Sequence, residues 1–523
     1  MNPTRAVWTI AVLAALARFP GALWPLRPDE AGFLLVARSW HPTADSLYGP
    51  YFVDRPPLLI AVVKAVDAAA GPYALRLVAA LGCSVAVLLA AACAREIAHH
   101  ARHPAPAQLV DRAAVGAAAL VAAFLATPQI DVVAAKGELL GVPVLLAGHL
   151  CALRAVRTAS WRHAAAAGFL GAVALGLKQS LIGTLVLMGA MLIAALVRHR
   201  LGARDFTRLA AATALGAAIP LGATAAWAVA AGVRLETLWR TVVTFRSEAS
   251  RVLLDQPSGA VSERAATLAL VFGTTGMLLI AVAFVVRSRR IAATLPGVGA
   301  AICVLAASDL AAVATSGSYW RPYLFALVPT LGLMWACAVL AGSPRTADEP
   351  ARHRPRLGLG VVGACAASAV ISLIGFMAIW WVGPPPQQAL LGHELGRVSQ
   401  PGDSLLVYGG RADVQWASGL PSPYEHLWSL PMRTLDPDLS ELRAVLAGPD
   451  APTWLVEVAR IDAWSELGTK PIKEELLSRY TYLGTVCGGM GVYRLDSAPP
   501  SPPISPPCDD TWRNFAWRGL PAG

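Results

Sequence analysis

The sequence places two adjacent carboxylates, Asp29 and Glu30, directly after its first long apolar stretch, and a third, Glu138, at the start of a later one. Charged groups at a membrane boundary are costly unless they are paired or functional. A positioned carboxylate can take the proton of a hydroxyl acceptor in a transfer reaction, so these three acids are candidate catalytic residues. Plainer interpretations stay open: solvated acids of an interfacial loop, or an acidic pair that stabilises a helix N-terminus. Asp131 can cap a helix or pair with Lys136.

Basic residues near the same apolar segments are candidates for binding a phosphate. Guanidinium and ammonium groups form charge-assisted hydrogen bonds to phosphate and stabilise the charge that develops when it leaves. The candidates are Arg55, Lys178 and Arg321, with Lys136 behind them. Arg55 precedes a Pro-Pro pair that fixes its backbone direction. Two alternatives remain: Lys178 as a helix end that snorkels to water, and Arg321 as the partner of Asp309.

Aromatic side chains accompany these charges, and we expect them to line a groove for donor and acceptor. They are Tyr48, Tyr51, Tyr319, Trp320 and Tyr323. No cysteine or histidine spacing is that of a metal site, so no metal ligand is assigned. The acidic residues leave a divalent cation such as magnesium or manganese open as a cofactor.

The composition indicates the class of protein that must position these residues. Of 523 residues, 56% are hydrophobic and only 15% are charged, and the mean hydropathy is +0.54. This composition predicts an integral membrane protein rather than a soluble one. The net charge of +10 comes from short basic clusters between apolar segments, which orient membrane helices and do not predict a nucleic-acid partner.

Apolar runs long enough to span a bilayer, roughly 20 residues each, predict about eleven transmembrane helices. The first is expected to be retained rather than cleaved as a signal peptide, because no clear cleavage site follows it. The expected spans are 6–24, 73–94, 113–130, 138–156, 164–182, 181–197, 208–231, 265–286, 291–314, 322–341 and 357–382.

Basic loops predict the orientation of these spans. Every even-numbered span ends in an arginine-rich loop, and such loops remain in the cytoplasm. The N-terminus is therefore expected inside a plasma-membrane protein, with residues 25–72, 232–264 and 383–523 outside. The basic residues are Arg95, Arg102 and Arg112; Arg154, Arg157 and Arg162; Arg198, Arg200, Arg204 and Arg208; residues 287–290 (RSRR); and Arg345, Arg352, Arg354 and Arg356.

The first outside loop is more than a connector. "AGFLLVARSW" has one apolar face at helical spacing, so we expect it to lie along the membrane surface. An aromatic turn and a double proline follow, and "PLLIAVVKAV" predicts a second amphipathic helix.

The tail is a different kind of sequence, so residues 1–382 and 383–523 are expected to be separate domains. Within the tail, 387–496 reads as a small α/β domain: a strand and a helix or second strand around "LLVYGGRADVQWAS", a buried strand in "APTWLVEV", a helix in "KEELLSRY" and an edge strand in "CGGMGVYRL". A proline-rich spacer follows. Cys487 and Cys508 flank it and are predicted to form a disulfide in an oxidising compartment; two free thiols are the alternative.

The ordered motifs of the first 335 residues resemble those of class C membrane glycosyltransferases, above all the protein O-mannosyltransferases and the lipid A aminoarabinose transferases. The resemblance is carried by "RPDEAGFLLVAR", "YGPYFVDRPP", "ALRL", "AKGELLGVP", "ALGLKQSLIG" and "SYWRPYLFALVP". It implies a polytopic helical fold and a polyprenyl-phosphate sugar donor. It also implies that Asp29 is the base and that Glu30 orients Arg55 or another cation. Arg321 and Pro322 stand where the family often has histidine, which weakens a role carried over to that position.

The predicted function is transfer of a sugar from a polyprenyl-phosphate donor to a glycan, lipid or protein acceptor outside the cytoplasm. Two alternatives are a flippase for lipid-linked sugars and a non-catalytic scaffold that binds cell-envelope glycans. The spans have no obvious internal repeat and few ionisable residues in mid-helix, which disfavours a transporter.

Overall fold

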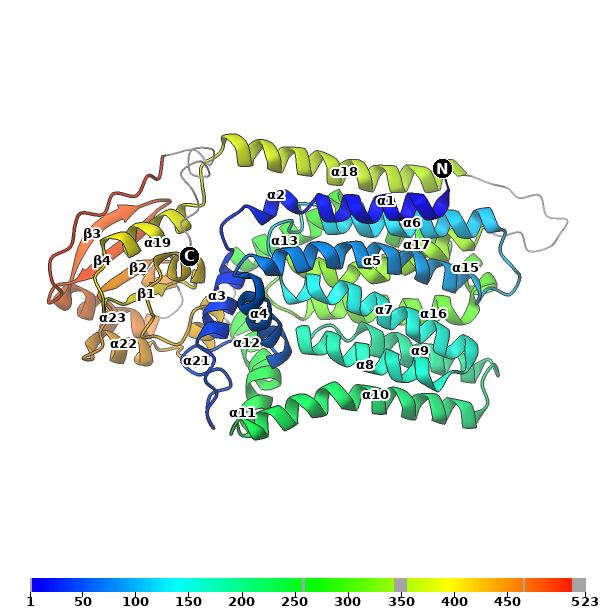
Figure 1. Cartoon of the computed structure of the whole chain (residues 1–523), viewed down its shortest axis with the longest axis horizontal. Helices are drawn as coiled ribbons and strands as arrows, with labels where there is room; N and C mark the ends of the chain where they lie inside the picture. Colours follow the sequence, from blue (N-terminus) through cyan, green and yellow to red (C-terminus); the bar gives the residue numbers. More distant parts are fainter. Residues whose placement is uncertain (1, 256–258, 343–354, 464–465, 510–523) are drawn as a thin grey trace.

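The computed structural model describes residues 2–255, 259–342, 355–463 and 466–509. It consists of a long bundle of roughly parallel helices with an α/β domain at one end, and the N-terminus lies at the other end (Figure 1). This arrangement confirms the predicted polytopic helical protein with a C-terminal α/β domain.

The bundle contains long helices and shorter helical segments between them. Its elements are α1 (Pro3–Leu16), α2 (Phe19–Ala22), α5 (Ala74–Ala98), α6 (Ala107–Ala126), α7 (Gly137–Thr158), α8 (Trp161–Leu177), α9 (Gly183–Val197), α10 (Ala203–Ala230), α13 (Gly259–Thr274), α14 (Met277–Val286), α15 (Ser288–Thr294), α16 (Pro296–Ala314), η2 (Arg321–Leu327), α17 (Val328–Leu340) and α18 (Pro355–Val382).

Seven helices of the described chain are long and apolar enough to cross a membrane. A bent pair, α13 and α14, is an eighth candidate; the two halves meet at 66°, and Gly276 supplies the positive φ of +85° at the break. Each expected span coincides with helix, but α1, α8 and α9 have only 14, 17 and 15 residues. The count of about eleven spans therefore stays a prediction.

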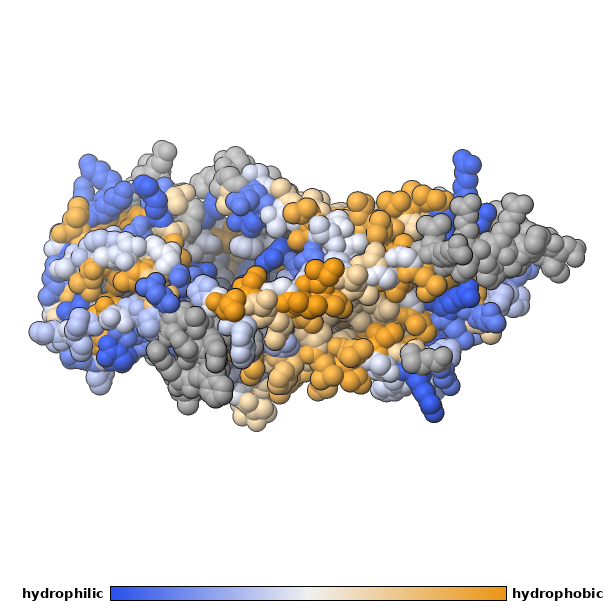
Figure 2. All heavy atoms as spheres, turned by 90° about the horizontal axis from the view of Figure 1, so that it is seen from above, coloured by the Kyte–Doolittle hydropathy of each residue, from blue (hydrophilic) through white to orange (hydrophobic). Residues whose placement is uncertain are grey.

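The surface of the bundle is apolar where lipid would lie. Figure 2 shows hydrophobic residues gathered over the helical body and hydrophilic residues toward both ends. Large side chains such as Leu81, Leu215 and Ile374 are more than 60% exposed. Exposed apolar area of this extent marks a membrane or partner surface, so the chain is a multi-pass membrane protein.

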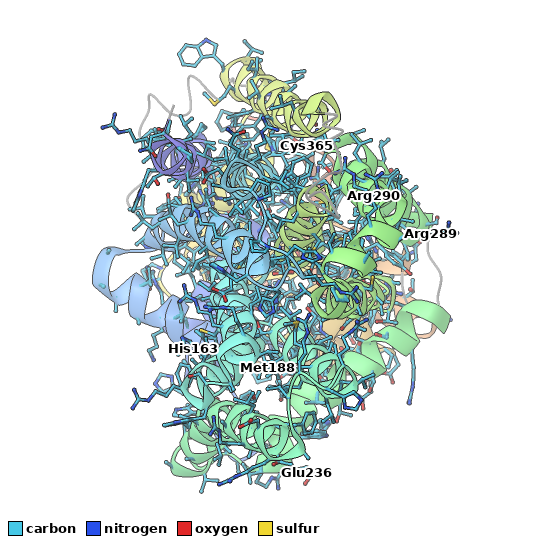
Figure 3. All side chains as sticks on the ribbon, turned by 90° about the vertical axis from the view of Figure 1, so that its right-hand side faces the viewer. His163, Met188, Glu236, Arg289, Arg290 and Cys365 are labelled. Carbon is cyan, nitrogen blue, oxygen red and sulfur yellow. A yellow bond between two sulfur atoms is a disulfide. The ribbon has the colours of Figure 1, made fainter. Side chains whose placement is uncertain are left out.

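Most of the expected basic loops lie together, at the end of the bundle opposite the α/β domain (Figure 1). Figure 3 looks onto that end, where His163, Arg289 and Arg290 are labelled. Residues 343–354, which include Arg345, Arg352 and Arg354, lie outside the described part of the chain. The shared end agrees with the loop pattern, while the side of the membrane on which it lies stays a prediction.

The first long loop forms α3 (Pro28–Arg38) and α4 (Pro57–Ala70) at the end of the bundle that carries the α/β domain. Protein covers more of α3 than an amphipathic helix on a membrane surface requires, because seven of its eleven residues are buried; its position along the membrane surface stays a prediction. The α/β domain covers the face of α3 that the bundle leaves free. Residues 232–264 are also not a simple loop: they form α11 (Leu235–Trp239), the π-helix η1 (Arg240–Thr244), α12 (Phe245–Asp255) and the start of α13.

The α/β domain has a four-stranded sheet in the order β1-β2-β4-β3. β1 pairs parallel to β2, with Leu405 opposite Trp454, and the other neighbours are antiparallel. Its elements are α19 (Gln387–Val398), β1 (Leu405–Tyr408), α20 (Ala412–Ser418), α21 (Ser429–Leu435), α22 (Ser440–Ala447), β2 (Trp454–Glu457), η3 (Ile461–Ala463), α23 (Glu466–Arg479), β3 (Tyr480–Val486) and β4 (Met490–Leu495).

Alternation along β1 explains why helices cover both faces of this sheet. Leu405 and Val407 join one apolar cluster with residues of α19 and α20, whereas Leu406 and Tyr408 join another with residues of α21, α22 and α23. Successive side chains of a strand point to opposite faces, so a fully apolar strand must be packed against other elements on both faces of the sheet. The expected first strand, the buried strand and the helix in "KEELLSRY" are present as β1, β2 and part of α23. The segment expected to be a helix or a second strand is the helix α20.

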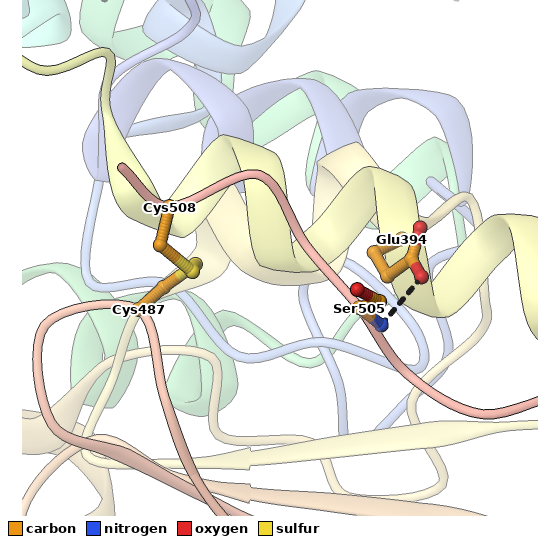
Figure 4. The surroundings of a disulfide bond; sticks show 4 residues. All are labelled: Glu394, Cys487, Ser505 and Cys508. Carbon is orange, nitrogen blue, oxygen red and sulfur yellow. Dashed lines mark hydrogen bonds between the residues drawn. A yellow bond between two sulfur atoms is a disulfide. The ribbon is translucent and has the colours of Figure 1, made fainter. Parts of the chain in front are cut away.

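The prediction that "CGGMGVYRL" forms an edge strand is wrong. β4 lies between β2 and β3, and β3 is the edge, with a register shift between Tyr482 and Gly484. The structure pairs Cys487 with Cys508 in a disulfide that closes the proline-rich segment back onto the sheet domain. Nearby, the backbone N–H of Ser505 donates to Glu394 at 2.8 Å (Figure 4).

Candidate active site

Asp29 lies in the first turn of α3, facing the end of the bundle. Its Oδ2 is 2.7 Å from the Nζ of Lys136, which immediately precedes α7. Its Oδ1 accepts a 3.1 Å hydrogen bond from the indole Nε1 of Trp428, a residue of the α/β domain. Three distant parts of the chain therefore meet at this one carboxylate.

The charges around Asp29 fix its protonation state. Burial alone would raise its pKa, but the positive charges of Lys136 and Arg55 and the hydrogen bonds from Lys136 and Trp428 hold the pKa well below its usual range. Asp29 is therefore an anion at any physiological pH. A carboxylate held this way is a weak base for as long as both cations stay against it.

Arg55 belongs to a small network at the start of α4. Its guanidinium is 2.5 Å from Asp54, and Asp54 also pairs with Arg246 at 2.8 Å. The hydroxyl of Tyr48 donates to the carbonyl of Arg55. Opposing charges on Asp54, Glu138 and Asp29 outweigh burial and raise the pKa of Arg55. Asp54 thus holds two arginines at the edge of the site.

A second buried ion pair joins Glu138, in the first turn of α7, to Lys178, which follows α8. The ammonium of Lys178 also lies 3.9 Å from the centre of the Tyr323 ring. Burial, opposed in part by Glu138 and assisted by the charges of Arg55 and Arg246, lowers the pKa of Lys178 to about 8. Lys178 is only 5% exposed, so it does not snorkel to water.

Arg246 reaches this network from the helix that directly follows the π-helix η1. Arg246 lies in the first turn of α12, directly after η1, and π-helical turns often mark functional positions. The carbonyl of Val242 within η1 accepts a 3.1 Å hydrogen bond from Gln179, which ties the turn to the segment that carries Lys178. Nothing in the sequence distinguishes Arg246 from its neighbours, and its role was missed.

Glu30 has a different environment from Asp29. It pairs with Arg76 of α5 at 2.6 Å, and both side chains are 3% exposed. It also accepts hydrogen bonds from the backbone N–H groups of Arg27 and Ala135, at 3.1 and 2.9 Å. The cation that Glu30 orients is thus Arg76 rather than Arg55. Both carboxylate oxygens of Glu30 already accept hydrogen bonds from Arg76 and from these two backbone N–H groups. Glu30 therefore has a structural role: it fixes the position of α3.

The remaining predicted site residues lie in different surroundings. Tyr323 is in the cluster, beside Lys178. Tyr48 and Tyr51 are buried and hold the first loop in place, and the hydroxyl of Tyr51 accepts a hydrogen bond from the N–H of Ser422.

Three other predicted residues lie outside the cluster. Trp320 is 53% exposed, with the Arg264 guanidinium over its ring. Arg321 donates to the carbonyl of Gln129, far away in the sequence, and Tyr319 donates to the nearby carbonyl of Ala314. Asp309 accepts from Thr330 instead of pairing with Arg321, and Asp131 caps a turn.

Gly32 makes the contact between α3 and the α/β domain possible. A Cβ at this position would lie 2.2 Å from the Trp428 ring, so any side chain would displace the indole. Trp428 also packs on Phe33, with ring centres 5.9 Å apart. The α/β domain therefore contributes directly to the surroundings of Asp29, which the sequence of the first loop alone could not indicate.

The donor set of this site does not suit a metal ion. Asp29, Asp54 and Glu138 are each paired with lysine or arginine, and within the described residues they do not form a set of three converging ligands. A divalent ion would have to displace these cations. The site is better suited to an anion that competes with the carboxylates for the same lysine and arginine side chains.

Comparisons with known proteins identify the fold. No protein-family model matches the sequence, and no curated protein matches it. Among solved structures, ArnT from Cupriavidus metallidurans bound to undecaprenyl phosphate superposes with a TM-score of 0.60 at 16% identity, covering 94% of this chain and 98% of that one. The oligosaccharyltransferase AglB from Archaeoglobus fulgidus, in complex with an inhibitory peptide and a dolichol-phosphate, gives 0.54 at 14% identity, with coverages of 94% and 75%.

The chain has the class C glycosyltransferase fold. ArnT and AglB are both membrane glycosyltransferases of that class, so the predicted resemblance is confirmed at the level of fold. The superposition with ArnT extends into the α/β domain, because it covers 94% of this chain.

Proposed function

We propose that this chain is a membrane glycosyltransferase that moves a sugar from a polyprenyl-phosphate donor to an acceptor outside the cytoplasm. The observation that carries the proposal is the set of cations Lys136, Arg55 and Lys178 around Asp29 and Glu138, at one end of a class C bundle. Solved structures with this fold hold undecaprenyl phosphate and dolichol-phosphate, which supports a lipid-linked donor here.

The donor phosphate would bind to the three cations. Arginine suits two-point contacts to phosphate, and lysine supplies a compact charge. Lys136 is 19% exposed and Arg55 15%, so both can reach a ligand from the edge of the bundle. Arg246 would hold Asp54 when Arg55 turns to the phosphate.

Donor binding would also activate Asp29. A phosphate that shares Lys136 and Arg55 removes the two charges that depress the pKa of Asp29, so the carboxylate becomes a stronger base when the donor is present. The acceptor oxygen then attacks the anomeric carbon while the bond from that carbon to the phosphate oxygen breaks. The acceptor proton passes to Asp29, polyprenyl phosphate leaves, and the anomeric centre inverts. Glu138 is the alternative base.

Turnover of a defined donor separates this proposal from its alternatives. Purified protein in vesicles would receive polyprenyl-phosphate sugars labelled in the sugar, with lysate lipids, glycans and peptides as acceptors. We expect free polyprenyl phosphate and transferred label, both lost when Lys136, Arg55 and Lys178 are replaced together by methionine. Arg289→Met and Arg290→Met, at the opposite end of the bundle, are the matched controls. Transbilayer movement of intact donor without cleavage would instead indicate a flippase.

A further inference from the structure

We propose that Glu425, His426 and Glu441 bind a divalent metal ion, with zinc as the best fit, in the α/β domain beside the first loop. This site is separate from the cluster around Asp29, and the proposal does not depend on the proposed transferase activity.

The three side chains converge closely enough to share one metal ion. One ligand atom from each lies within 4.8 Å of the others. The Nε2 of His426 is 3.5 Å from a carboxylate oxygen of Glu425 and 3.4 Å from one of Glu441. Ligands at about 2.0–2.1 Å from a tetrahedral zinc lie about 3.3–3.4 Å apart. Two of the three separations therefore need almost no change.

His426 is the observation that distinguishes this site from a chance group of acids. Its side chain is fully buried, between the rings of Tyr424 and Phe52 at 5.0 and 6.2 Å. Neither ring nitrogen has a hydrogen-bond partner among the described residues, although buried polar atoms almost always have one. A metal ion at Nε2 would satisfy the nitrogen that points between the two carboxylates.

The charges of the site also favour a cation. The electrostatic neighbours that raise the pKa of Glu425, besides burial, are Glu441 and Asp436, both acidic. Burial lowers the pKa of His426 to about 4, so its imidazole is neutral and its lone pair is free for a metal. The side chains of Glu425 and Glu441 are 47% and 55% exposed, which gives an ion access from water and leaves room for a water ligand.

A metal at this position would fix the segment of the α/β domain that contacts the first loop. The carbonyl of Glu425 accepts a 3.0 Å hydrogen bond from the N–H of Phe52, and Trp428 follows His426 by two residues. The ion would thus link α22, through Glu441, to the segment that places Trp428 on Asp29. It is a positioning site, and no step of the transfer passes through it.

Binding of Zn²⁺ to the purified full-length chain tests the proposal. After treatment with a chelator, the protein would be titrated with Zn²⁺ in competition with a chromophoric chelator. We expect one tight equivalent, weakened at least tenfold in Glu441→Gln and in His426→Ala. Glu474→Gln, an exposed acid on neighbouring α23 that is 62% exposed, should bind as the unaltered chain does.

The proposal stays testable even if His426→Ala does not fold, because Glu425→Gln and Glu441→Gln change half-exposed side chains and should leave the fold intact. We also expect Zn²⁺ to raise the unfolding temperature of the unaltered chain and not of the Glu425→Gln/Glu441→Gln double variant. Tight zinc binding that is equal in all variants would place the metal elsewhere, and absence of tight binding to the unaltered chain would equally overturn the proposal.

Discussion

Asp29 combines two properties that oppose each other in the proposed mechanism. The proposed reaction needs it as a base, yet two cations and an indole N–H stabilise its anion. The conflict disappears if the donor phosphate takes over Lys136 and Arg55, because then the base is strengthened only when there is a sugar to transfer. In the absence of donor, the carboxylates thus pair with the same cations that the donor phosphate would bind.

Arg55 should bind the donor phosphate. Replacing it with alanine removes a charged hydrogen bond, so donor affinity should fall about tenfold to about 100-fold, and Arg55→Lys should lose less. Surface plasmon resonance or a filter assay with labelled donor measures both. Arg264→Ala, which alters a guanidinium stacked on exposed Trp320, is the control. Unchanged affinity in both Arg55 variants would move the phosphate toward Lys178.

Lys178 should make donor binding depend on pH. Its pKa is lowered to about 8, so the ammonium that binds phosphate is present below pH 8 and is lost as the pH rises through that value. A donor phosphodiester does not titrate in this range. Affinity of the unaltered chain should therefore decline above pH 8, while Lys178→Met should bind more weakly without that decline. An identical pH profile in the two proteins would rule out Lys178 as the titrating group.

The types of the site residues could be predicted from sequence better than their partners could. Asp29, Arg55, Glu138 and Lys178 were selected as charges at the ends of apolar segments, and the structure brings them together. Their pairing depends on which helix ends are neighbours in the bundle, which spacing along the chain does not determine. Arg321 was grouped with them for the same reason, but its guanidinium contacts the carbonyl of Gln129 instead.

At the scale of elements, α3 makes more contacts with protein than its amphipathic pattern indicated. Its start follows from Pro28 and from Glu30, whose side chain caps the N-terminus. Its second face is covered by the α/β domain, with the guanidinium of Arg38 stacked 4.5 Å from the Trp416 ring. An apolar face that meets protein and one that meets lipid have the same sequence pattern, so the prediction of a surface helix could not distinguish them.

Gly32 should control the docking of Trp428. The first carbon of any side chain would collide with the indole, so Gly32→Val should free residues 421–429 to exchange amide hydrogens faster and should lower turnover. Trp428→Phe keeps most of the packing and removes the N–H that positions Asp29. Turnover should therefore fall about tenfold, the effect of one lost hydrogen bond to a charged group, because misplacement of the carboxylate outweighs its higher basicity. Hydrogen exchange and donor turnover measure the two effects.

Gly189→Val is the matched control for this experiment, because a side chain at Gly189 of α9 would meet no atom within 4 Å. Normal exchange and normal turnover in Gly32→Val would mean that the docking of the α/β domain has no part in the reaction.

For the whole molecule, composition and hydropathy predicted the class of fold because membrane helices must be long and apolar. The sheet domain was predicted less completely. β3 was missed, and β4 was therefore given its place at the edge, since "YTYLGTV" has little buried side-chain area to mark it. The number of spans also stays open, because α1 and α9 are short and local sequence does not determine how deeply a short helix is inserted.

The orientation of the molecule can be tested with single cysteines at its two ends. Gln400→Cys, on the exposed surface of the α/β domain, should react with an impermeant maleimide in intact cells. Arg289→Cys, at the basic end shown in Figure 3, should react only after lysis, because positively charged loops remain in the cytoplasm. Reaction of Arg289→Cys in intact cells and of Gln400→Cys only after lysis would invert the topology and place the site inside.

The most direct measurement of the central claim is donor turnover by Asp29→Asn compared with Glu138→Gln, alongside donor affinity for each. Asparagine keeps the shape of the side chain and removes the base, so turnover should fall by about 10²–10⁴-fold while donor binding is retained. Glu138→Gln should keep more activity than Asp29→Asn, because Asp29 remains available as the base. If Asp29→Asn retained most of the activity and Glu138→Gln lost it, Glu138 would be the base and the assignment of Asp29 would be wrong.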